Sequence, residues 1–116
     1  MQISLIGYLS DARPGDTLFY VRGAEDPVIE VTVDALELML DADGYSPFWI
    51  DCHWTDEAGE PQSGCIFTHV LFKSKEDAIK YLRDEEKKEI ERYQESIVKA
   101  RSNILRLEEQ LAQLHV

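Results

Sequence analysis

A regular apolar repeat near the C-terminus constrains the fold of this chain more than any other feature. Residues 74–116 contain neither Gly nor Pro, and from residue 90 onward apolar residues or Tyr recur at alternating steps of three and four. Four heptads with filled a and d positions drive helices to supercoil. We call these eight positions the heptad seam: Ile90, Tyr93, Ile97, Ala100, Ile104, Leu107, Leu111 and Leu114. The pattern predicts a long C-terminal coiled-coil helix that pairs with other copies of the chain in a homo-oligomer.

The seam leaves the number and direction of the helices open. Ile at most a positions favours a parallel two-stranded coil, whereas Ala100 at a d position permits the close approach that antiparallel helices use. Three further apolar residues widen the face and favour three or more helices, or a helix flanked by another protomer's β domain: Val98, Leu105 and Ala112. The competing arrangement is a single helix folded along its own β domain.

The start of this helix is marked by Ser74 as N-cap, with Asp77 three residues later. Ala78, Ile79 and Leu82 form a short apolar stripe that we expect to pack on the preceding domain. The charged residues 83–89 then interrupt the apolar positions. Two alternatives remain: one continuous helix, or a bend in 83–89 between a docking helix and an assembly helix.

Residues 1–73 read as a separate acidic β domain, followed by the helical segment 74–116. Alternation and turn residues predict five strands, at Gln2–Leu9, Thr17–Arg22, Val28–Val33, Phe48–Trp54 and Cys65–Phe72. Segment 34–42 fits either a short capped helix or a strand. The fold class is therefore α+β: a small antiparallel SH3-like β-barrel or curled sheet, followed by a coiled-coil helix.

Charge is unevenly distributed along the chain. The formal net charge is −11, and residues 1–74 hold 13 Asp and Glu against three Lys and Arg, a balance of −10. Such a domain repels phosphate backbones and anionic membranes, so we expect no direct nucleic-acid or membrane binding. A basic protein partner fits this charge.

Localisation is predicted to be cytoplasmic. The first residues lack the basic and small-residue features of a secretory signal, and no apolar run approaches the length of a membrane span. Two cysteines are too few for a secreted disulfide framework.

The predicted barrel offers an aromatic, ionisable outer face. If Phe48, Ile50, Cys52 and Trp54 point inward with Ile66, Val70 and Phe72, the outer face carries the alternate residues: Trp49, Asp51, His53, Phe67, His69 and Leu71. Such a face is suited to binding a partner or ligand. Packing of the helix start against it is the alternative explanation.

Acidic residues in two loops form a second candidate partner site. They are Asp41, Asp43, Asp56, Glu57 and Glu60. We expect the two loops to form one end of the barrel, where carboxylates would occupy a basic groove of another protein. Solubility is the competing explanation for the acid surplus.

Metal binding and catalysis are not expected, and no cofactor is predicted. Cys52, His53, Cys65 and His69 form a zinc-capable set, but the neighbours Cys52 and His53 point to opposite faces of a strand. Asp51 and His53 are close enough on one face to hydrogen-bond, yet no nucleophile elbow or phosphate loop accompanies them.

The strand-rich half leads through Phe72-Lys73-Ser74-Lys75-Glu76-Asp77-Ala78 into the helix. This layout resembles small bacterial and phage-encoded proteins with a barrel and a C-terminal assembly helix, among them phage anti-defence proteins. The resemblance implies an oligomeric inhibitor. Its alternative implication is a sponge that traps a small nucleotide between protomers, for which Arg13, Arg22 or Lys73 would line the pocket. A small enzyme or metal-binding module is a further alternative.

Overall fold

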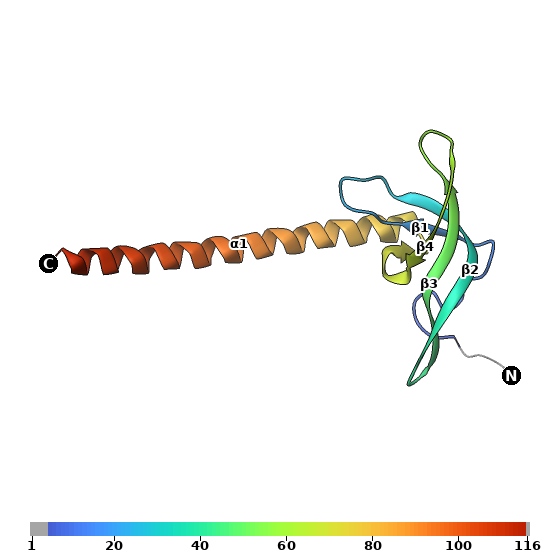
Figure 1. Ribbon diagram of the computed structural model, residues 1–116, viewed down its shortest axis with the longest axis horizontal. Coiled ribbons are helices and arrows are strands. Elements are labelled where there is room, and N and C mark those ends of the chain that lie inside the picture. Colours follow the sequence, from blue (N-terminus) through green and yellow to red (C-terminus); the bar gives the residue numbers. More distant parts are fainter. Residues whose placement is uncertain (1–4, 116) are drawn as a thin grey trace. The chain divides into compact units, whose positions relative to one another are not determined.

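The computed structural model of the protein describes residues 5–115 (Figure 1). In chain order they form β1 (Thr17–Tyr20), β2 (Ile29–Asp41), β3 (Gly44–Thr55), β4 (Pro61–Phe67), the 3-10 turn η1 (Thr68–Val70), β5 (Leu71–Phe72) and α1 (Lys75–Leu114). The fold class is α+β, as predicted: a curled, five-stranded antiparallel half-barrel and one long helix.

The sheet has the order β4-β3-β2-β1-β5. The first four strands form a meander in chain order, and the short β5 returns to the free edge of β1 through the pair Tyr20 and Leu71. The long strand β2 changes partner along its length, since it pairs with β1 up to Thr32 and with β3 from Thr32 onward. This change of partner accompanies the curl of the sheet.

Segment 34–42, for which helix and strand were both open, is extended as far as Asp41. Its residues pair with β3 from Ala35 to Asp41, and Ala42 and Asp43 form the turn. The Asp41 carboxylate accepts a hydrogen bond from the Asp43 amide at 2.9 Å. Gly44 follows with a φ of 144°, a conformation that side chains disfavour. Residues 41–44 therefore form a tight turn between β2 and β3.

Two β-bulges break the alternation that the sequence suggests. The pairs Val33–Cys52 and Ala35–Asp51 leave Asp34 as an extra residue, and a second shift lies between Glu37 and Leu38. The second bulge leaves Phe48 without a partner on β2, because Trp49 pairs with Glu37 and Pro47 with Leu38. The prediction that Phe48 points inward is wrong: its side chain is 37% exposed.

The predicted strand Cys65–Phe72 is divided. β4 begins at Pro61, four residues before the predicted start at Cys65, and it ends at Phe67 before the turn η1. This turn changes the phase of the chain, so that Leu71 pairs with β1. Leu71 is only 1% exposed, and its predicted place on the outer face is wrong.

The core lies on the concave side of the half-barrel. The largest fully buried side chains are Ile50, Leu71, Val31, Val33 and Cys52. Leu9, Ala12, Leu18 and Ile66 complete the cluster. Burial of several branched side chains is the main source of stability for a domain of this size.

The predicted first strand is not formed in its described part, and Gln2–Ser4 lie outside the described residues. Leu5 makes a single parallel bridge with Tyr45, and the Ile6 amide donates to the Tyr45 carbonyl at 2.8 Å. The chain then turns at Gly7, whose φ is 96°. Leu9 nevertheless reaches the core.

Tyr8 and Lys73 attach this N-terminal segment to the start of the helix. The Tyr8 hydroxyl accepts a hydrogen bond from the Lys73 amide at 3.0 Å and donates to the Asp77 carboxylate at 3.4 Å. The Lys73 ammonium lies 2.7 Å from Asp11 and 5.2 Å from the centre of the Tyr8 ring. Hydrogen bonding from Lys73 lowers the pKa of Asp11.

The helix begins as predicted. The Ser74 hydroxyl accepts a hydrogen bond from the Asp77 amide at 3.1 Å, which confirms the N-cap. Ala78 is fully buried and Leu82 is half-buried, but Ile79 is 51% exposed, so the predicted docking stripe is wrong at that position. Tyr81 packs instead, with its ring 5.0 Å from that of Phe72.

The chain divides into two compact units, one ending at Leu82 and the other starting at Arg83. The boundary falls inside α1 because its first two turns belong with the sheet. The helix itself is continuous through 83–89. No helix among residues 5–115 combines the length and the apolar character that a membrane span requires.

Candidate functional site

The predicted acidic site is split between two hairpin ends. Asp41 and Asp43 flank the turn before β3, whereas the turn that holds Asp56, Glu57 and Glu60 follows β3. β3 has 12 residues, which at about 3.3 Å each separates the two turns by roughly 35 Å along the strand. Figure 1 shows the two turns at opposite ends of the β3 ribbon. The expectation that both loops form one end of the barrel is therefore wrong.

Asp56 organises the second of these turns. Its carboxylate accepts hydrogen bonds from the amides of Ala58 and Glu60 at 3.0 and 2.8 Å, and from the Gln62 side chain at 3.0 Å. The bond from the Glu60 amide is the main cause that lowers the pKa of Asp56. Asp56 thus stays charged to low pH, and Glu57 and Glu60 beside it are exposed.

The predicted aromatic face gathers four rings. Trp49 and Phe67, which are cross-strand partners, stack with their ring centres 3.4 Å apart. Phe48 meets Phe67 edge-on at 5.1 Å, and His69 lies 5.1 Å from Phe67. Phe48 joins this cluster because of the bulge, which sequence alternation could not reveal. The start of α1 makes its aromatic contact through Tyr81 with Phe72, which is not one of these four rings.

His53 is held by a partner that the sequence analysis missed. Its Nδ1 lies 2.7 Å from a carboxylate oxygen of Asp34, the extra residue of the first bulge. Both side chains are about half exposed. Asp51, the partner considered from sequence, lies instead beside Cys65 across the β3–β4 ladder. A lone, solvated His–Asp pair on a sheet surface is a weak basis for catalysis.

The two thiols differ in burial but are both protonated at neutral pH. Burial, reinforced by Asp34 and Asp51, raises the pKa of Cys52 to about 11. Desolvation and the Asp51 carboxylate raise the pKa of Cys65 to about 11. Because the thiolate is the reactive form, neither cysteine is activated as a nucleophile.

One group of side chains has the spacing of metal ligands. Ligand atoms of Glu37, Asp51 and Cys65 lie within 4.8 Å of one another on the outer face of the sheet. This group differs from the set of Cys52, His53, Cys65 and His69 that was considered from sequence. In that set Cys52 is buried and its neighbour His53 is exposed, so the two side chains point to opposite faces of β3. A cation there would have to displace the Cys65 proton.

The heptad seam is exposed along its whole length in the single chain. Its larger side chains are between 49% and 79% exposed, from Ile97 to Leu114. Val98 and Leu105, which widen the face, are also more than half exposed. A run of exposed branched side chains on one helix face is unlike an ordinary solvated surface.

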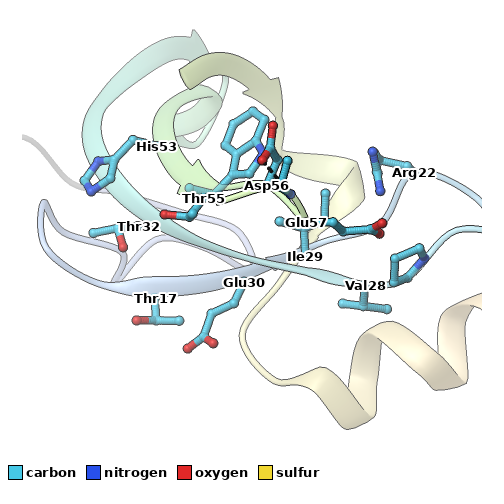
Figure 2. A pocket seen from close by; sticks show the side chains of 13 residues that line it. Thr17, Arg22, Val28, Ile29, Glu30, Thr32, His53, Thr55, Asp56 and Glu57 are labelled. Atoms are coloured by element: carbon cyan, nitrogen blue, oxygen red, sulfur yellow. Dashed lines mark hydrogen bonds between the residues drawn. The ribbon is translucent and has the colours of Figure 1, made fainter. Parts of the chain in front are cut away.

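A cavity of about 930 Å³ lies where β2 and β3 diverge (Figure 2). Its lining includes the start of β2, the end of β3 and the turn after it, with Trp54, Ile29, Glu30 and Glu57 among the contributors. Figure 2 shows Arg22 and Glu57 toward one end and His53 and Thr32 toward the other. Sequence reasoning missed this cavity, since it depends on where the β2–β3 ladder stops.

Comparisons with protein-family models, with curated proteins and with solved structures find no match to this chain.

Proposed function

We propose that the protein is a non-enzymatic, homo-oligomeric binding protein, in which the heptad seam joins copies as a coiled coil and the acidic β domain engages a basic protein partner. The observation that carries the proposal is the continuous exposure of the seam. The exposed aliphatic side chains and the Tyr93 ring of the seam gain the hydrophobic free energy of burial only when another helix covers them.

The acidic character of the β domain supports a basic partner. Carboxylates project from both hairpin ends, and thirteen acids in residues 1–74 face only three bases. Such a surface accelerates encounter with a positively charged protein and repels nucleic acid. Several acidic domains presented by one oligomer would add avidity, which suits an inhibitor of the anti-defence type.

The SH3-like description of the half-barrel is part of this proposal. It is supported by the meander β1–β4 and by the return of β5, the last strand in the chain, to the free edge of β1. Small barrels of this kind present loops and sheet edges as binding surfaces.

The first test measures the mass of the intact chain by sedimentation equilibrium, where we expect a multiple of the chain mass. The second titrates an arginine-rich peptide against two variants with equal net charge. One variant reverses four β-domain acids to Lys: Asp41, Asp43, Asp56 and Glu57. The other reverses four exposed helix acids: Asp84, Glu91, Glu95 and Glu109.

Only the β-domain variant should lose binding. Equal loss in both variants would show an unspecific charge effect and contradict the proposal, as would a parent chain that stays monomeric.

A further inference from the structure

The strands β2 and β3 present unpaired edges to each other at the cavity. Their ladder stops at the pair Thr32–His53, although both strands continue beyond it. Ile29 and Glu30 pair with β1 on their other side, and Trp54 and Thr55 pair with β4. Within residues 5–115, no strand pairs with the facing edges of these four residues. Such edges are templates for an added strand.

The wall of the cavity includes a fixed aromatic ring. The Trp54 indole meets the Tyr20 ring edge-on, with centres 6.1 Å apart. The indole also lies beside Gly64 of β4, where an added Cβ would stand 3.4 Å from it. The neighbouring Tyr20 ring restricts the indole, so a ligand that contacts it would lose little additional side-chain entropy.

Charge at the cavity favours a cationic occupant. Three carboxylates line it, from Glu30, Asp56 and Glu57, against the single guanidinium of Arg22. Figure 2 shows Glu57 extending toward the Arg22 end, whereas Glu30 lies apart from Arg22 along β2. Among the described ion pairs none involves Glu30. Glu30 alternates with the core-facing residues Ile29 and Val31, so it lies on the opposite face of the sheet from Trp54, which packs against the core. An arginine or lysine on the outer face would gain an ion pair with Glu30, and an apolar side chain of the same extended segment would contact Trp54 on the inner face.

We infer that the cavity between β2 and β3 binds an extended, basic segment of the partner protein. The segment adds main-chain hydrogen bonds to the open strand edges, places apolar side chains against Trp54 on the inner face and pairs a cationic side chain with Glu30 on the outer face. The inference rests on the proposed function and locates its binding site. A volume of about 930 Å³ is within the range of ligand pockets, roughly 300–1,000 Å³. A nucleotide fits the site poorly, because its phosphates would meet three carboxylates.

The experiment uses the full chain and a fluorescent peptide of alternating Arg and Val. Two companion peptides carry Glu in place of Arg, or N-methyl groups on alternate backbone amides. Binding is followed by anisotropy, and its location by amide NMR shifts of Ile29, Glu30, Trp54 and Thr55. Glu30→Lys changes the cavity, and Glu109→Lys makes the same charge change at an exposed residue of the helix, outside the β domain and the seam.

We expect the Arg peptide to bind and to shift the four amides. Glu30→Lys should weaken it about tenfold or more, since it replaces an attraction by a repulsion, whereas Glu109→Lys should change the affinity less than about twofold. Methylation of the backbone amides should also weaken binding about tenfold, because it removes the main-chain donors.

Different failures have different meanings. If the Arg peptide binds but Glu30→Lys leaves its affinity unchanged, the basic partner stands and the cavity site is overturned. If Glu30→Lys and Glu109→Lys weaken it equally, the effect of charge is unspecific and both proposals are overturned. Absence of binding by the parent overturns both proposals. Tighter binding of the Glu peptide overturns the charge argument. If the four amide shifts depend on protein concentration alone and Glu30→Lys lowers the oligomer mass, a second copy occupies the cavity, which also overturns the inference.

Discussion

Replacement of Ile97 by Asp gives the most direct test of the heptad seam. In the single chain the Ile97 side chain is 49% exposed, so about half of its surface remains to be covered by a partner helix. Full burial of an aliphatic side chain contributes about 1.5–3 kcal/mol, and the uncovered half therefore about 1 kcal/mol. An unpaired carboxylate at the same place adds a penalty of at least about 2 kcal/mol.

The loss is about 3 kcal/mol per chain and about 6 kcal/mol for a symmetric dimer, in which the change occurs twice. At 1.4 kcal/mol for each factor of ten, the dissociation constant rises by roughly four orders of magnitude. Sedimentation equilibrium over a range of protein concentrations measures this constant. Far-UV circular dichroism on the same samples reports whether loss of assembly also reduces helicity.

Ser102→Asp is the matched control, because it places the same charge on the same helix at an exposed residue outside the seam. We expect Ser102→Asp to assemble like the parent, within about tenfold. If the Ile97→Asp chain has the oligomer mass of the parent, the seam is not the contact between copies. If Ile97→Asp and Ser102→Asp raise the dissociation constant equally, the contact does not lie on the seam face of the helix.

Three further predictions concern the stability of the folded chain. Ser74→Ala should lower the free energy of unfolding by about 1 kcal/mol in urea titrations, because the helix loses its N-cap. Ile50→Ala should lower it by about 2–5 kcal/mol, since Ile50 is fully buried, whereas Leu40→Ala, at a 64% exposed site, should change it little. Lys73 lowers the folded-state pKa of Asp11 below the usual 3.8, so the stabilising effect of Asp11 is present above that pH and is lost as pH falls through the folded-state pKa. The difference in melting temperature between the parent and Asp11→Asn should therefore be constant near neutral pH and disappear in acid; a difference that persists at low pH would contradict the role of the Lys73 contact.

Local patterns were sufficient for the helical part of the chain. The N-cap Ser74 and the heptad seam follow from residues three or four apart, because helical hydrogen bonds and side-chain neighbours are local. The sequence left a bend in residues 83–89 open, and the structure shows one continuous helix from Lys75 to Leu114. The turn at 41–44 is equally local, since its Asp and Gly satisfy the backbone within a few residues.

The sheet depended on pairing between distant segments, which sequence periodicity does not encode. One bulge exposes Phe48, and the turn η1 brings Leu71 into the core, because a one-residue change of phase moves a side chain to the other face. The separation of the two acidic turns follows from their attachment to opposite ends of β3. The cavity beside Trp54 likewise exists because the β2–β3 ladder ends before its strands do, a feature that only the tertiary pairing decides.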